Sequence, residues 1–324
     1  MNVLYATYPW AFETPGGGEI QLLNYEKYIN NNRIRIVRND PWLAQLDEVD
    51  LVHFFSCIGG SSHFCAYVKQ RRIPLVVTSS LWLTERNKHE YPLSEISYQL
   101  SLADGILVNG ESEKMSLVSV IGVDPGRIHV IRNGFDPIFS EEIGPASFRS
   151  AFNIDYDFIL NIGNIEPRKN QLNLIRAAKC LGMRVVLIGA IRDQAYAERC
   201  ISEGAENTVH IGYLKHDNAL LRSAISAANV FCLPSTLETP GLAALEAAAA
   251  GARLVITQEG STSEYFDQNA VYVDPQSVEN IAEGILFAIK NPKSNHLKDH
   301  VCSKYTWPKV TRVLEDLYLG LKRN

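Results

Sequence analysis

Short runs of β-branched and other apolar residues alternate along the chain with stretches of helical periodicity. Runs that are apolar on both alternating faces are typical of parallel strands covered by helices on either side. A helix-compatible stretch or a turn signal follows each run. The expected strands are Val3–Thr7, Ile34–Arg38, Asp50–Phe55, Leu75–Thr78, Gly105–Asn109, Ile128–Ile131, Phe158–Gly163, Arg184–Gly189, Thr208–Gly212, Val230–Pro234, Leu254–Thr257 and Val271–Val273.

A turn-rich segment divides these strands into two series of six. Turn-forming residues occupy Asn133–Pro137, and polar and small residues continue through Glu141–Pro145. The pattern therefore predicts an α/β protein with two tandem Rossmann-like, doubly wound domains, residues 1–144 and 145–304. Helices are expected at Gln171–Leu181 and Asn218–Ala228. A last helix at Trp307–Leu321 carries an apolar stripe, whose partner surface periodicity does not identify.

Composition narrows the classes of function. The 324 residues carry a formal net charge of -5, which provides no global positive field for nucleic acid. No apolar run approaches the length of a membrane span, and Met1–Tyr5 does not resemble a secretory leader. The six cysteines are scattered without metal-ligand spacing, as is typical of free thiols in a reducing compartment. We therefore expect a cytoplasmic protein with no metal site.

A first glycine-rich loop follows the first strand and opens a helix. Gly16, Gly17 and Gly18 have no Cβ, so an anion can approach the backbone of this loop and its N–H groups can face that anion. The spacing is not that of the dinucleotide-binding fingerprint. A flexible turn explains the three glycines equally well.

A second loop, Gly163–Asn170, separates a strand from the helix that begins at Gln171. Asn170 is a natural N-cap residue. Arg168 and Lys169 stand just before the helix, where two cations would help to neutralise a diphosphate leaving group. The alternative is ordinary solvated surface charge.

The third loop runs from Glu238 into an alanine-rich segment. Pro240 suits a first helical turn, which places Glu238 in the loop and Glu246 on the helix. The alanines indicate a helix packed on nearly all sides, so the Glu246 carboxylate needs a hydrogen-bond partner. Ribose hydroxyls would supply one, and a structural arginine would do equally well.

Together the three loops resemble the retaining glycosyltransferases of family 4, which have the GT-B fold of two Rossmann-like domains with a cleft between them. The E-x7-E signature from Glu238 to Glu246 is the most specific match. Glu166–Asn170 resembles the basic diphosphate loop of the family, and Ile128–Asp136 its interdomain connection. The similarity covers nearly the whole chain in the right order.

The resemblance implies a role for each loop. Glu238 would contact the transferred sugar, Glu246 the ribose, and Arg168 or Lys169 the diphosphate. Gly16, Gly17 and Gly18 would approach the phosphates from the opposite domain. Asn164, Gly241 and Leu242 fall within the donor-binding region. No metal or other cofactor is implied, and the final helix, about 305–324, would pack back on the N-terminal domain.

The acceptor side departs from the family pattern. Ser80 follows the fourth strand, where relatives often have histidine, and His53 lacks a second histidine two residues later. His53 and Ser80 are the acceptor-side candidates. Trp10, Phe12, Trp82 and Tyr91 are aromatic residues on loops beyond strand ends, where they could stack on a sugar, meet a membrane surface or belong to the core.

The sequence thus predicts a metal-independent hexosyltransferase that uses a UDP- or GDP-linked sugar in polysaccharide biosynthesis. The acceptor would be a glycan, a lipid-linked glycan or another hydroxyl compound, and nucleic acid is excluded. Peripheral contact with the inner face of a membrane stays open, as does the oligomeric state. Two alternatives are a nucleotide-sugar epimerase on the same fold and a non-catalytic scaffold that binds a nucleotide or glycan.

Overall fold

The twelve predicted strands are confirmed. A computed structural model of the chain describes residues 1–13, 15–29 and 31–322. Each strand lies within its predicted run or extends it by one residue. The strands are β1 Asn2–Thr7, β2 Arg35–Arg38, β3 Leu51–Phe55, β4 Leu75–Thr78, β5 Gly105–Val108, β6 Ile128–Val130, β7 Phe158–Ile162, β8 Arg184–Ile188, β9 Thr208–Gly212, β10 Val230–Leu233, β11 Leu254–Thr257 and β12 Val271–Val273.

The strands form two parallel six-stranded sheets. The first has the order β2-β1-β3-β4-β5-β6 and the second β12-β11-β10-β7-β8-β9. In the first sheet the winding reverses between β1 and β3. In the second it reverses between β7 and β10. The loops that follow strands at such a reversal diverge to opposite faces of the sheet, and the crevice they leave is where open α/β sheets bind ligands.

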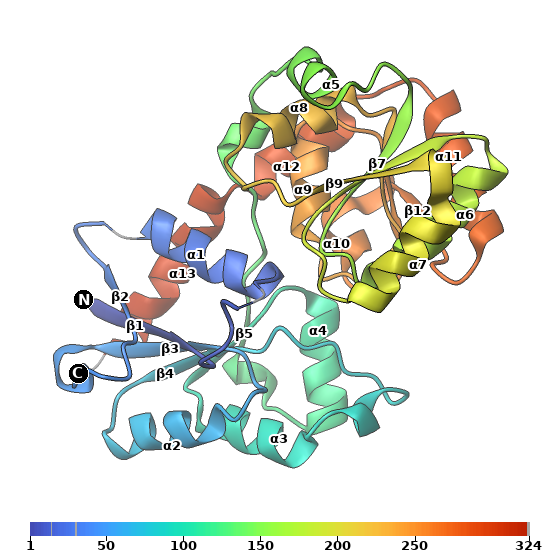
Figure 1. Ribbon diagram of the computed structural model, residues 1–324. Coiled ribbons are helices and arrows are strands. Elements are labelled where there is room, and N and C mark those ends of the chain that lie inside the picture. The colour runs from blue at the N-terminus through green and yellow to red at the C-terminus, as the bar shows by residue number, and fades with distance from the viewer. Residues whose placement is uncertain (14, 30, 323–324) are drawn as a thin grey trace. The chain divides into compact units, whose positions relative to one another are not determined.

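Helices cover both faces of each sheet, as the doubly wound prediction requires (Figure 1). In the first sheet α1 and α13 lie on one face, and α2 and α3 on the other. The helices are α1 Gly17–Ile29, α2 Ser62–Gln70, α3 Leu93–Leu102, α4 Glu111–Ser116, α5 Ala146–Phe152, α6 Gln171–Cys180, α7 Gln194–Gly204, α8 Ala219–Ala227, α9 Leu242–Ala249, α10 Thr262–Phe266, α11 Val278–Lys290, α12 His296–Lys304 and α13 Trp307–Gly320.

The chain divides into two compact units, Met1–Gly134 with Trp307 onward, and Phe135–Thr306. The division therefore falls ten residues before the boundary expected after residue 144. The reason is that Phe135 and Phe139 are fully buried in the core of the second unit. The last helix begins at Trp307 rather than near 305, and residues 323–324 of the expected range lie outside the described residues.

The core of the second unit follows the alternation of side chains along its strands. In β7, Phe158 and Leu160 join the cluster beneath α5, α8 and α9. Ile159 faces the opposite side and joins the cluster beneath α6, α7 and α11. Burial on both faces explains why the strand is apolar at successive positions.

The core of the first unit depends on α13. Trp307, Leu314 and Tyr318 of this helix are buried, and α13 packs on α1. The Trp307 ring lies edge-on to Tyr25 of α1, with ring centroids 5.7 Å apart. The helix therefore completes one face of the first sheet.

Candidate functional site

The loops at the reversal point of the second sheet bring the predicted donor residues together. Arg168 and Lys169 follow β7, and Glu238 follows β10, the strand paired with β7. Lys169 Nζ donates to Glu238 Oε1 at 2.6 Å, and Arg168 lies 3.8 Å from the same oxygen. Residues 69 positions apart in the sequence thus form one charged group at the edge of the sheet where ligands are expected.

Burial makes this ion pair electrostatically strong. The Glu238 side chain is 5% exposed and that of Lys169 14%. Burial alone would raise the pKa of Glu238, but the charges of Lys169 and Arg168 outweigh it and hold that pKa below its ordinary value. Burial lowers the pKa of Lys169, against the opposing influence of Glu238. Arg168, whose side chain is 47% exposed, is the cation of the group that water reaches most freely.

Backbone contacts fix the two loops to each other. Arg168 Nη1 donates to the carbonyl of Leu237 at 3.2 Å, and the Thr236 amide donates to the carbonyl of Arg168 at 2.9 Å. The sequence predicts that the Asn170 side chain caps α6. In the structure Asn170 has a left-handed φ of 57°, and its side-chain Nδ2 donates to the carbonyls of Pro234 and Pro275. The cations are therefore held on a rigid support.

Glycines on either side of Glu238 permit this geometry. Gly241 has φ 89°, and a Cβ there would lie 3.1 Å from Glu238 Oε2. Gly260 has φ 104°, and a Cβ there would lie 2.0 Å from the carbonyl oxygen of Glu238. Both positions exclude larger residues, so the close approach of backbone to Glu238 is built into the sequence.

The E-x7-E spacing places its two glutamates on different elements, as expected. Glu238 is in the loop, and Glu246 is buried on α9. The helix begins at Leu242, so Pro240 precedes it rather than forming its first turn. Glu246 Oε1 is hydrogen-bonded to Nε2 of His216, a residue of the loop after β9. The structural partner of Glu246 is therefore a histidine and not an arginine.

Glu166 and Arg192 join the charged group without having been singled out in the sequence. The Glu166 carboxylate accepts from Arg168 at 3.2 Å and from Arg192 at 3.1 Å. Arg192 comes from the loop after β8, which pairs with the second loop through the Ile165–Ile191 bridge. Glu166 does lie within the basic motif, but no periodic signal marks Arg192.

Asn164, Gly241 and Leu242 lie in the same group of loops. The Asn164 carbonyl accepts from Gln171 Nε2 at 2.9 Å, which ties the second loop to the first turn of α6. Gly241 is the N-cap of α9, and Leu242 is its first residue. All three are thus placed at the carboxyl edge of the second sheet.

The glycine-rich loop belongs to the first unit and opens α1. Gly16 donates its N–H to Glu19 Oε2 at 2.7 Å, so a carboxylate of the chain already occupies this amide. A Cβ at Gly17 or Gly18 would meet no atom within 4 Å. Neither glycine is needed for packing within the unit.

The two acceptor-side candidates differ sharply in position. Ser80 is exposed at the carboxyl end of β4, with a left-handed φ of 48°. His53 is fully buried in β3. Its Nδ1 bonds to Tyr318 Oη at 2.5 Å and its Nε2 to Thr78 Oγ1 at 2.7 Å. Because both ring nitrogens are engaged and no surface is exposed, His53 stabilises the core and cannot contact an acceptor in this conformation.

The aromatic loop residues are only partly on the surface. Trp10 and Phe12 are exposed, whereas Trp82 and Tyr91 are half-buried. Tyr91 packs against the core of the first unit. No helix among the described residues is both long and apolar enough to cross a membrane.

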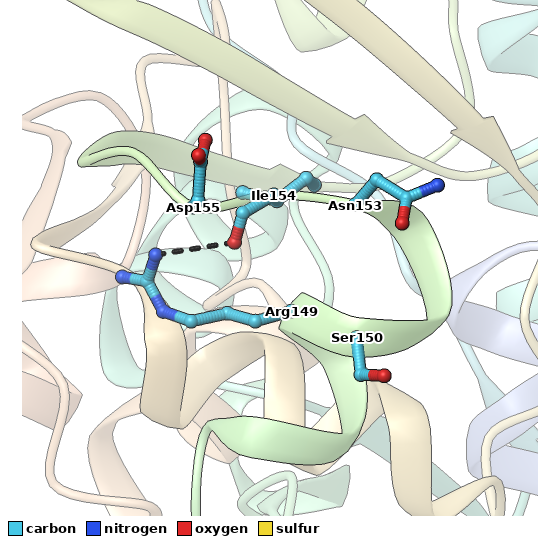
Figure 2. A pocket seen from close by; sticks show the side chains of 5 residues that line it. All are labelled: Arg149, Ser150, Asn153, Ile154 and Asp155. Atoms are coloured by element: carbon cyan, nitrogen blue, oxygen red, sulfur yellow. Dashed lines mark hydrogen bonds between the residues drawn. The ribbon is translucent and has the colours of Figure 1, made fainter.

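A shallow pocket of about 410 Å³ lies elsewhere on the second unit (Figure 2). It is lined by Arg149, Ser150, Asn153, Ile154 and Asp155. Arg149 donates to the carbonyls of Ile154 and Tyr156 at 3.3 and 3.0 Å and to that of Ala227. These residues lie before the start of β7, at the amino edge of the sheet. The guanidinium of Arg149 holds the turn between α5 and β7, so these residues have a structural role.

Comparison with known proteins identifies the family and the fold. The model of the glycosyl transferases group 1 matches residues 145–305, and that of glycosyltransferase family 4 matches residues 13–139. An uncharacterised glycosyltransferase of Methanocaldococcus jannaschii is 26% identical over 235 residues, which are 66% of this chain and 59% of that protein. A D-inositol 3-phosphate glycosyltransferase of Mycobacterium avium is 28% identical over 219 residues, 62% of this chain and 51% of its own length.

The chain thus spans only about half to three-fifths of the length of these curated relatives. Among solved structures, HepE of Anabaena in complex with UDP superimposes with a TM-score of 0.81 at 16% identity, covering 99% of this chain and 100% of that one. The same protein has also been solved with UDP-glucose. The two family models match most of both units, and the fold agrees over 99% of the chain. The chain therefore belongs to the group 1 glycosyltransferases of family 4, with the GT-B fold.

Proposed function

We propose that the chain is a retaining glycosyltransferase that transfers a hexosyl group from a UDP- or GDP-linked sugar to a hydroxyl acceptor. The observation that carries this proposal is the Lys169–Glu238 ion pair, with Arg168 beside it, at the reversal point of the second sheet. It combines a cation for a diphosphate with a carboxylate for a sugar. Membership of the family and the binding of UDP-glucose by HepE support the nucleotide-sugar donor.

The charges suit a leaving diphosphate. As the bond from the anomeric carbon to the phosphate oxygen breaks, negative charge builds on the departing nucleotide. Lys169 and Arg168 stabilise that charge, and the largely buried position of Lys169 strengthens its effect. Glu238, held ionised, faces the transferred sugar. The acceptor oxygen forms its bond on the face that the diphosphate leaves, its proton passes to the departing phosphate oxygen, and the configuration is retained.

Metal-independent turnover is part of the proposal. The cations of the second loop would do what a divalent ion does in other transferases. EDTA should leave turnover unchanged, and activity that is abolished by EDTA and restored by manganese would overturn this point.

The acceptor is proposed only by chemical class, as a glycan, a lipid-linked glycan or another hydroxyl compound. Ser80 stays the acceptor-side candidate, since its hydroxyl is exposed at a strand end and its backbone is held in a sparsely populated conformation. Trp10 and Phe12 are exposed aromatic residues that could stack on a sugar ring or contact a membrane surface.

The decisive experiment incubates the protein with a panel of nucleotide sugars and candidate acceptors and measures released UDP or GDP. Acceptor-dependent release with an unchanged anomeric configuration supports the proposal. Conversion of the donor sugar without release of nucleotide would indicate an epimerase. Tight nucleotide binding with no conversion of any donor would indicate a scaffold.

A further inference from the structure

Glu246 is a carboxylate in an apolar helix. It is 4% exposed, while Ala244, Ala247 and Ala248 around it on α9 are fully buried. A carboxylate in such surroundings costs stability unless a donor satisfies it. Each oxygen of the Glu246 carboxylate therefore needs a hydrogen-bond donor.

One oxygen of Glu246 has a hydrogen-bond partner within the chain. His216 Nε2 bonds to Oε1 from the loop between β9 and α8. The His216 ring meets the buried ring of Phe139 edge-on, with centroids 5.0 Å apart. The His216 side chain is 30% exposed. Two contacts from different elements thus fix the orientation of the imidazole.

The other oxygen of Glu246 stays available. Among the residues that the structure describes, none bonds to Oε2. A carboxylate with one oxygen anchored and the other free presents a single acceptor in a fixed direction. Ordering of this kind lowers the entropy lost when a ligand hydroxyl binds.

We propose that His216 is a positioning residue for donor binding. It anchors Oε1 of Glu246 and so directs Oε2 toward a ribose hydroxyl of the nucleotide. The inference rests on the proposed function, in which Glu246 receives the ribose, and adds a residue that lies 30 positions away in the sequence and outside the family motif. His216 acts through Glu246 and not on the ligand itself.

The test compares variants by calorimetry with UDP and GDP and by steady-state kinetics. His216→Ala should raise the nucleotide Kd and the donor KM by about 3- to 10-fold, the equivalent of one lost hydrogen bond, with kcat within about twofold. His216→Gln, which can still donate from a side-chain nitrogen, should restore most of the affinity. His300→Ala is the matched control, because His300 bonds to the Tyr265 carbonyl at 3.0 Å and not to Glu246.

A double-mutant cycle separates positioning from direct contact. Adding His216→Ala to Glu246→Ala should cause no further loss of affinity. A further loss would mean that His216 touches the ligand, and unchanged affinity in the single variant would mean that it is merely structural. Either result overturns the inference while the proposed function stands. Failure of the unaltered protein to bind UDP or GDP would instead overturn the proposed function, and this inference with it.

Discussion

Lys169 Nζ lies 2.6 Å from Glu238 Oε1, so the cation proposed for the diphosphate and the carboxylate proposed for the sugar are bound to each other. Neither can be altered without changing the other. Variants at this site must therefore be judged by charge as well as by size.

The pH dependence of turnover should reveal the charge of Lys169. Burial lowers its pKa from the usual 10.5, so a step that needs the ammonium should fail on the alkaline side at a pH below 10.5. The pKa of Glu238 lies below its usual 4.5, so its acid limb should appear at lower pH than an ordinary carboxylate gives. Lys169→Arg should move the alkaline limb upward, since a guanidinium does not titrate there. An unmoved limb in the pH profile of kcat would assign it to another group.

Removing the cations of Arg168 and Lys169 should slow the chemical step. Alanine at both Arg168 and Lys169 should lower kcat by about 10²-fold or more, as for other groups that stabilise developing charge. Alanine at Lys179, whose Nζ bonds to the carbonyl of Glu203, is the control and should turn over normally. Normal turnover of the double variant would show that these two cations are ordinary surface charges with no role in catalysis.

The two glutamates should divide binding from catalysis. Glu246→Ala should weaken donor binding by about 1.5–3 kcal/mol, the cost of one lost charged hydrogen bond. It should spare kcat, because the proposed ribose contact is equal in ground and transition states. Glu238→Gln should mainly depress kcat; glutamine is preferred to alanine here because it fills the same space beside Lys169. Kinetics of both variants, with calorimetric binding of free nucleotide, provide the measurement. Loss of nucleotide binding in Glu238→Gln alone would reverse the placement of the donor.

Glu166 should matter although it is not expected to touch substrate. It holds Arg168 and Arg192 at once, so Glu166→Gln, which loses the charge and keeps one acceptor oxygen, should weaken this support and lower kcat by about fivefold or more. Glu203→Gln is the control, since Glu203 pairs with Arg176 on the surface and should leave kcat unchanged. Equal kcat values for both variants would show that Arg168 needs no such support.

Tyr318→Phe should weaken the first unit and spare the donor site. The hydroxyl bonds to His53 and to Tyr5, both buried, and its loss should lower the free energy of unfolding by about 1–3 kcal/mol. Tyr213→Phe, at an exposed position, should cost nothing measurable. Denaturant unfolding measures the loss, and nucleotide affinity should be unchanged. Reduced affinity in Tyr318→Phe would contradict the assignment of the donor site to the second unit.

Gly18→Ala tests whether the bare backbone of the first loop receives an anion. The added Cβ meets nothing within 4 Å, so stability should hold, while kcat/KM should fall about tenfold if a phosphate lies against the loop. Gly320→Ala on α13, where a Cβ also meets nothing, is the matched control. Full activity of Gly18→Ala would leave the glycines as a flexible turn.

The sequence predicted the strands well because most of them are short apolar runs, as parallel strands buried on both faces must be. The edge strands β2 and β9 are less buried. The sequence also indicated the loops that carry the candidate site. The burial of His53 could have been predicted from its place in the run Leu51–Phe55, whose other members are all apolar.

Other features of the site depend on tertiary structure. The contact between Lys169 and Glu238 requires β10 to lie beside β7, and strand order leaves no trace in periodicity. His216 and Arg192 stand in loops, where no repeating pattern marks a residue. The conformation of Asn170 is set by carbonyls more than 60 residues away, which no local capping rule contains.

The return of α13 to the first unit sets an order of events during synthesis. Phe135–Thr306 is continuous and can emerge complete from the ribosome, whereas the first 134 residues must wait for the last helix to cover Tyr25 and Tyr5. We expect the second unit to reach its folded state first, although it is made later. Until α13 has been synthesised, the part of the first unit that it covers beside α1 stays exposed, and a nascent chain arrested before Trp307 should be bound by chaperones there.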